Sequence, residues 1–171
     1  VLYDSAEDRV MSAHELSPAA LAEVVDVAQT VLGTVGFGAE RAGGSLADAV
    51  EDLFVVERHY SENALFEGFG VVSMGELVGQ PAVKFLIRNT DYSAPELYEL
   101  IAPHIDPELA HLTYSMQEGI LEVAAPNVTK RRGVEWLAEH TGVAQQETIA
   151  FGDMPNDIEM LQWAGCGVAM E

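Results

Sequence analysis

Residues Phe151 to Leu161, which read F-G-D-M-P-N-D-I-E-M-L, decide the fold that this sequence predicts. Just ahead of the turn, Thr148 to Phe151 form a short apolar run of the kind found in a buried parallel strand. Gly152 permits a tight turn, and Pro155 suits the first turn of a helix, where a missing N–H costs nothing. The stretch therefore predicts a strand, a sharp turn and a helix.

Oxygen-bearing side chains gather at this turn. Asp153 would stand at the carboxyl end of the strand, with Asn156 and Asp157 on the first helical turn. Open α/β sheets bind ligands at that edge, and such oxygens suit a hard cation such as Mg²⁺. The alternative is a set of ordinary helix caps, which need no ligand. A Ca²⁺-binding loop is disfavoured because the twelve-residue spacing with a terminal Glu is missing.

A second feature precedes this turn in the chain. Thr129 is a suitable N-cap, so Lys130 is expected at the N-terminus of a helix, where the helix dipole favours anions. Gly142 would end that helix before the strand begins. One helical face carries the apolar residues Val134, Leu137 and Ala138. The order predicts an αβα half-unit with a cation and two carboxylates at one edge.

Residues 119–170 resemble the C-terminal core of the haloacid dehalogenase superfamily. The motifs are G-I-L-E-V-A-A-P-N-V-T-K, then E-T-I-A-F-G-D-M-P-N-D, then G-V-A-M, and they are typical of the Cof-type, sugar-phosphatase-like branch with a large α/β cap. The resemblance implies that Lys130 binds the phosphoryl group. It also implies that Asp153 and Asp157 serve the Mg²⁺ site, with Asn156 in support.

The sequence departs from the family pattern at the nucleophile. No D-x-D-G-[ST] motif, which would supply the attacking Asp and the general acid, occurs in these 171 residues. Asp4 is followed by Ser5, and Asp106-Pro107-Glu108 lacks the glycine and hydroxyl that should follow. We therefore expect a fragment of α/β class: a cap at residues 1–126, then the C-terminal half of a Rossmann-like core at 127–171. On its own this chain should be inactive.

Periodicity outlines the expected cap. Ser17-Pro18 starts a helix that runs to Gly33, and Ser93 to Glu96 resembles a capping box. We expect helices to cover one sheet face, and a helical turn at 61–66. Strands are expected at 1–4, 9–11, 34–39, 53–56, 82–87, 109–114 and 120–124.

Arg88 and Asn89 are weaker candidates for substrate contacts. They follow the expected strand at 82–87, so they could reach into a substrate cleft. The alternative is a solvated strand end, the usual setting of charged and amide side chains.

Composition limits the function classes. Eight Lys and Arg against 28 Asp and Glu give a formal charge of −20, which argues against nucleic acid and against anionic membranes. Cys166 is the only cysteine, so no intrachain disulfide can form and a cytoplasmic location is expected. Its apolar neighbours predict a buried strand.

The resemblance implies a Mg²⁺-dependent phosphatase that acts on a small phosphorylated metabolite through an aspartyl-phosphate. The alternative is a non-catalytic module that binds a ligand or a partner through the cap. In a half-core the strand that ends at Asp153 would expose an apolar edge, and such edges pair with other chains. We therefore expect self-association.

Overall fold

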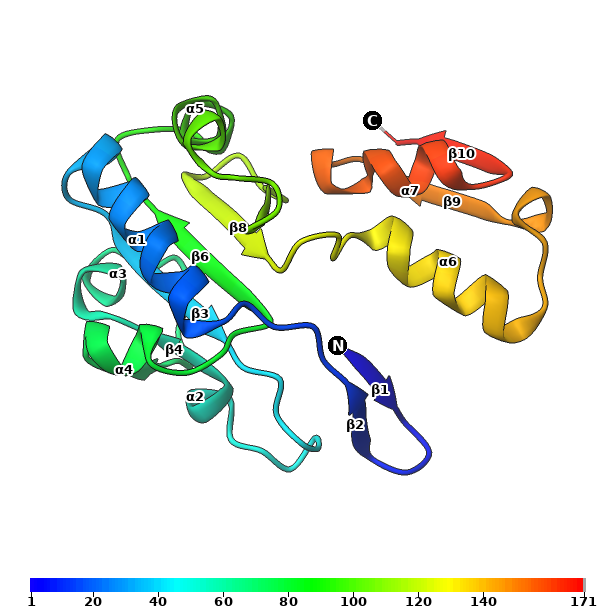
Figure 1. Cartoon of the computed structure of the whole chain (residues 1–171), viewed down its shortest axis with the longest axis horizontal. Helices are drawn as coiled ribbons and strands as arrows, with labels where there is room; N and C mark the ends of the chain where they lie inside the picture. Colours follow the sequence, from blue (N-terminus) through cyan, green and yellow to red (C-terminus); the bar gives the residue numbers. More distant parts are fainter. Residues whose placement is uncertain (171) are drawn as a thin grey trace.

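A mixed six-stranded sheet lies at the centre of the larger α/β unit, in a computed structural model that describes residues 1–170 (Figure 1). The strand order is β5-β4-β3-β6-β8-β7. Neighbouring strands are antiparallel except β4 and β5, which are parallel. The bounds are β3 (Gly36–Glu40), β4 (Phe54–Val56), β5 (Gly70–Val71), β6 (Lys84–Arg88), β7 (His111–Thr113) and β8 (Ile120–Ala124).

Helices α1 (Pro18–Leu32), α4 (Met74–Val78) and α5 (Ala94–Ile101) pack on one face of this sheet. The apolar face of α1 is buried because its hydrophobic residues recur at helical spacing. Beneath the helices, the rings of Phe37 and Phe85 stack with centroids 5.6 Å apart. This layer holds the main hydrophobic core.

Cap signals correctly predicted the two longer helices of this unit. The Ser17 side chain accepts a hydrogen bond from the N–H of Ala20, and Gly33 ends α1 with a φ of 73°. At α5, Glu96 accepts hydrogen bonds from the backbone and hydroxyl of Ser93. The helix positions follow from local sequence chemistry.

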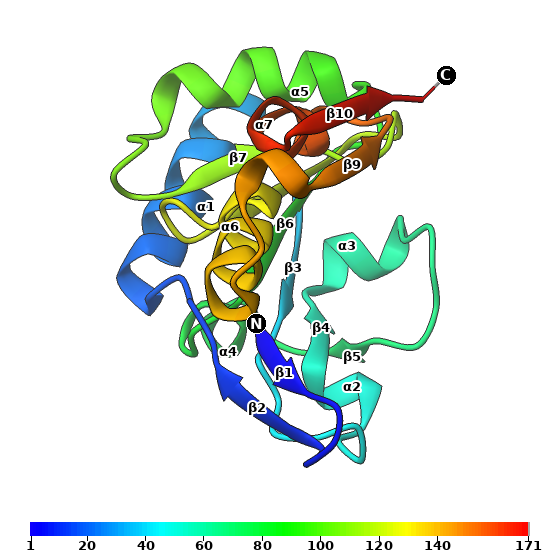
Figure 2. The same ribbon diagram turned by 90° about the vertical axis from the view of Figure 1, so that its right-hand side faces the viewer.

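The second face of the sheet is also partly covered, which the expectation of one covered face missed. Helix α3 (Arg58–Glu62) lies on the side of the sheet opposite α1 (Figure 2). Its Tyr60 belongs to a smaller cluster with Val56, Leu86 and Ile120. The helical turn expected at 61–66 begins earlier because Glu57 caps it. The Glu57 carboxylate accepts hydrogen bonds from the N–H groups of residues 37, 59 and 60. Two further short elements are α2 (Val50–Leu53) and the 3₁₀ turn η1 (Ala102–His104).

The first strands form a hairpin of their own. β1 (Leu2–Asp4) and β2 (Arg9–Ser12) pair antiparallel in a two-stranded sheet, as their residues predicted. Two hydrogen bonds tie the hairpin to the loop after β3: the N–H of Val10 donates to the backbone oxygen of Gly44, and the Asp8 carboxylate accepts from the N–H of Leu46.

A small α/β unit (residues 128–170) follows β8 and lies beside the large one (Figures 1 and 2). Its two strands, β9 and β10, pair in parallel. The helix expected after Pro155 begins with a 3₁₀ turn. The elements are α6 (Lys130–Thr141), η2 (Gln145–Glu147), β9 (Ile149–Gly152), η3 (Pro155–Asp157), α7 (Ile158–Trp163) and β10 (Cys166–Ala169).

The burial expected for these strands is wrong. Ile149 and Phe151 of β9 are 60% and 54% exposed, and Cys166 is exposed as well. The apolar run correctly predicted a parallel strand, but two strands offer too little surface for both faces to be covered. An apolar face therefore remains open.

Within residues 1–170, no helix has the length and apolarity that crossing a membrane needs.

Candidate active site

Lys130 and Asp157 form the centre of the candidate site. Thr129 caps α6 by accepting a hydrogen bond from the N–H of Arg132, which places Lys130 at the first helical position. The Lys130 ammonium donates to Oδ1 of Asp157 in a close ion pair. It also lies 3.3 Å from Oδ1 of Asn156. The start of α6 and the turn that precedes α7 therefore lie together, as the sequence predicted.

The Asp157 carboxylate is nearly saturated by its neighbours. Its Oδ2 accepts hydrogen bonds from the N–H groups of Asp153 and Met154, at 3.3 and 3.2 Å. Burial alone would raise the pKa of Asp157, but the hydrogen bond and charge of Lys130, together with the two N–H groups, outweigh it. The net effect holds the pKa of Asp157 below its ordinary value.

Gly152 lets Asp157 approach the end of the strand. A Cβ on Gly152 would lie only 2.4 Å from Cβ of Asp157. Among residues 1–170 the glycines with positive φ do not include Gly152, so close approach, rather than an unusual turn, requires glycine here. The Gly-Asp motif thus encodes a packing contact.

Asp153 differs from Asp157 because its carboxylate is exposed and makes no hydrogen bond or ion pair with the described residues. No group of three or more His, Cys, Asp and Glu side chains could hold a metal within residues 1–170. Mg²⁺ nevertheless binds through one or two carboxylates while it keeps waters and phosphate oxygens. The free oxygens of Asp153, with the Asn156 amide nearby, fit such an ion. Asp157 is occupied by Lys130.

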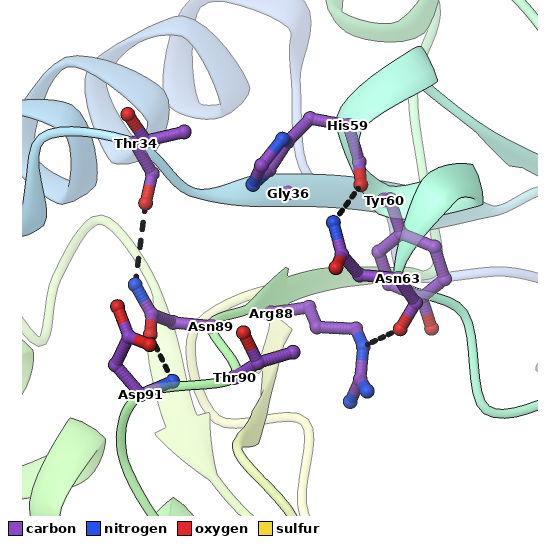
Figure 3. A pocket seen from close by; sticks show the side chains of 9 residues that line it. All are labelled: Thr34, Gly36, His59, Tyr60, Asn63, Arg88, Asn89, Thr90 and Asp91. Atoms are coloured by element: carbon purple, nitrogen blue, oxygen red, sulfur yellow. Dashed lines mark hydrogen bonds between the residues drawn. The ribbon is translucent and has the colours of Figure 1, made fainter.

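Arg88 and Asn89 lie in a different place. Arg88 ends β6 and Asn89 follows it. The two residues are 6% and 7% exposed, so the alternative of a solvated strand end is wrong. Both line a cavity under α3 (Figure 3). In Figure 1, α3 and α6 are widely separated, so this cavity is remote from Lys130.

A family model described as haloacid dehalogenase-like hydrolase matches residues 1–171. The chain belongs to this family. A relative in Bacillus subtilis, 5-amino-6-(5-phospho-D-ribitylamino)uracil phosphatase YitU, is 28% identical over 132 residues, which cover 73% of the chain and 48% of YitU. The Escherichia coli phosphatase YbjI, named for the same substrate, is 42% identical over 88 residues, 52% of the chain and 32% of YbjI.

Solved structures share the fold of this haloacid dehalogenase-like chain. A phosphatase of the superfamily from Bacteroides thetaiotaomicron, BT1666, has a TM-score of 0.69 at 18% identity and covers 94% of the chain and 56% of BT1666. The subclass IIB sugar phosphatase BT4131 has a TM-score of 0.67 at 20% identity, with 92% and 56% covered. The chain spans about half the length of YitU and of both phosphatase structures.

Sequence reasoning missed the residues that complete the cavity under α3 in this family member. His59, Tyr60 and Asn63 come from α3 and its end, while Thr34 precedes β3. No spacing rule joins them to Arg88, because strand register and the fold of α3 over the sheet bring them together. The signal that could have found them is weak: a charged residue at the inward position of a central strand.

Proposed function

We propose that the whole protein is a Mg²⁺-dependent phosphatase that hydrolyses a small phosphorylated metabolite. The observation that carries this proposal is the pairing of Lys130 with Asp157 beside the free carboxylate of Asp153. A fixed cation and a free carboxylate at one loop edge are what the transfer of a phosphoryl group requires, because its catalysis is chiefly positioning and charge stabilisation.

Each residue has a role that follows from its contacts. Asp157 and the first turn of α6 hold the Lys130 ammonium in place, so that it can donate a hydrogen bond to a phosphoryl oxygen. The Lys130 ammonium also donates to Oδ1 of Asn156, and this second contact restricts the conformations of the lysine side chain. Asp153 would hold Mg²⁺, and the ion would supply positive charge to the phosphoryl oxygens.

The attacking group is the family's Asp in D-x-D-G-[ST], a motif that does not occur in residues 1–171. We therefore propose that this chain alone does not turn over phosphate esters. We also propose that residues 1–126 act as a cap, which would exclude water and select the substrate. Mg²⁺-dependent hydrolysis by the chain alone, abolished by Asp153→Ala, would overturn the claim of a missing nucleophile.

The test is phosphate release by the full-length protein. The substrates are a panel of small phosphate esters that includes the ribitylaminouracil phosphate for which YitU and YbjI are named. Asp153→Asn and Lys130→Met should each lower kcat by about 100-fold or more, in line with the loss of one charge-stabilising group. Asp26→Asn, an exposed change on α1, should leave kcat unchanged. Full activity in both site variants would contradict the proposal.

We further propose that the chain self-associates through the apolar face of β9, where Ile149 and Phe151 are exposed. Analytical ultracentrifugation should show concentration-dependent association of the wild type that Phe151→Lys weakens. A monomer at every concentration would count against it.

A further inference from the structure

A polar cavity lies under α3 in the large α/β unit. Its volume is about 140 Å³, and it is bounded by the end of β6, the start of β3 and α3 (Figure 3). Most of its lining is polar, with Thr34, His59, Asn63 and Asn89 among the contributors. A cavity of this size and polarity has room for one small charged group.

Arg88 is the unusual member of this lining. It is more than nine-tenths buried, yet none of the ion pairs among residues 1–170 includes it. Its Nε donates to the backbone oxygen of Asn63 at 2.5 Å, which is a neutral partner. A buried charge is costly unless it is paired.

The terminal nitrogens of Arg88 remain available. They have no hydrogen bond to a described residue, while every fully buried side-chain nitrogen or oxygen within residues 1–170 has a partner. These nitrogens therefore still reach solvent. The contrast is Arg41, whose guanidinium donates to the backbone oxygens of Leu77, Gln80 and Pro81 at 2.7 Å each. Arg41 therefore has a structural role, whereas the terminal nitrogens of Arg88 are free to donate hydrogen bonds to a ligand.

The fold places Arg88 here through register and close packing. On β6, Phe85 and Ile87 point into the main core, so Arg88 points to the opposite face, toward α3. Gly36 pairs with it on β3, and a Cβ on Gly36 would lie 2.8 Å from Cα of Tyr60. The missing side chain lets α3 come close enough to bury Arg88.

Charge is arranged across the cavity. In Figure 3 the guanidinium of Arg88 lies beside Asn63 and Tyr60, while Asp91 lies on the other side beside Asn89. The Asn89 amide donates to the backbone oxygen of Thr34, and its Oδ1 accepts from the N–H of Asp91. An oxyanion at the Arg88 side would satisfy the free donors. Hydroxyl groups of the same ligand could donate to Asp91.

We propose that this cavity binds the phosphate or carboxylate head group of a small hydroxylated metabolite, with Arg88 as the anion-binding residue. The site is separate from Lys130, because α3 and α6 lie far apart in Figure 1. It does not depend on the proposed phosphatase activity.

The experiment titrates the chain with inorganic phosphate, glycerate and glycerol, in the presence of a chelator and without Mg²⁺, and follows backbone amide shifts by NMR. Phosphate or glycerate should shift the amides of Gly36, Asn63 and 89–91, while neutral glycerol should not. A response to phosphate alone identifies a phosphate head group, and a response to glycerate alone identifies a carboxylate. No response to either oxyanion would overturn the proposal.

Variants separate this site from the phosphoryl site. Arg88→Gln should weaken binding by at least about tenfold, the loss expected for hydrogen bonds to a charged group. Arg58→Gln, an exposed change on α3, and Lys130→Ala should leave these shifts unchanged. Unaltered binding in Arg88→Gln would refute the assignment even if the phosphatase proposal held.

A second variant covers the case in which Arg88→Gln fails to fold. Asp91 is exposed and its carboxylate opposes an anion, so Asp91→Asn should tighten phosphate binding by roughly twofold or more. Asp26→Asn makes the same change in net charge on α1 and should have no effect. Equal affinity in Asp91→Asn and Asp26→Asn would contradict the predicted charge arrangement.

Discussion

The large and small α/β units differ in how completely they bury the apolar side chains of their strands. Phe37 in β3 is fully buried between a six-stranded sheet and its helices, whereas Phe151 in β9 is 54% exposed in a two-stranded sheet. Both residues are aromatic and both lie in short strands. The difference teaches that burial depends on the number of layers assembled around a strand rather than on the strand's own residues.

The largest expected effect uses one substitution in both units. Phe37→Ala should lower the free energy of unfolding by about 3–5 kcal/mol, because it removes a buried ring that stacks on Phe85. In the monomer, at low protein concentration, Phe151→Ala should lower it by less than about 1 kcal/mol, since half of the ring is then in water. Urea denaturation of the two variants measures both values. Similar losses would show that the small unit is buried in solution, and the comparison would then fail.

A second pair of variants tests packing inside the small unit. Gly152→Ala would place a methyl group 2.4 Å from Cβ of Asp157, so it should cost about 1–3 kcal/mol and displace Lys130 from its partner. Gly133→Ala in α6 meets nothing within 4 Å and should stabilise the helix by about 0.5–1 kcal/mol. Amide hydrogen exchange over residues 149–160 reports the local change. Equal protection in both variants would rule out the close contact.

A smaller effect concerns pH. The folded pKa of Asp157 lies below its ordinary value of 3.8, so the ion pair with Lys130 stabilises the small unit above that pH. This contribution is lost as the pH falls through the folded pKa. Lys130→Ala should raise the pKa of Asp157, which carboxyl ¹³C NMR can follow. The large unit provides the internal control, because no part of this ion pair lies within it. An unchanged titration in Lys130→Ala would mean that the ion pair does not form in solution.

Local signals carried most of the sequence-based prediction. Ser17 and Gly33 bound α1, and Thr129 and Gly142 bound α6, because a cap depends on residues within one turn. Helix α4, with its own capping box at Ser73, went unpredicted because its apolar pattern spans only five residues. A helix of five residues is too short to show a clear helical repeat of apolar residues in the sequence.

Long-range features were harder to predict. The motifs correctly predicted that Lys130 lies near Asp157. Their spacing could not show that the lysine forms an ion pair with Asp157 and leaves the Asp153 carboxylate without a partner among the described residues. The exposure of Phe151 and the burial of Arg88 were both missed. Each depends on which distant elements cover a strand, and a single sequence carries little information on that point.

The most direct test of the candidate site is a Mg²⁺ titration of this chain followed by amide NMR. We predict that Mg²⁺ shifts the amides of residues 152–157 and leaves those of β3 and β6 unchanged. Asp153→Asn should abolish the shifts, and Asp106→Asn, an exposed control in the large unit, should retain them. Shifts that persist in Asp153→Asn, or that appear only in the large unit, would contradict a metal-binding role for Asp153.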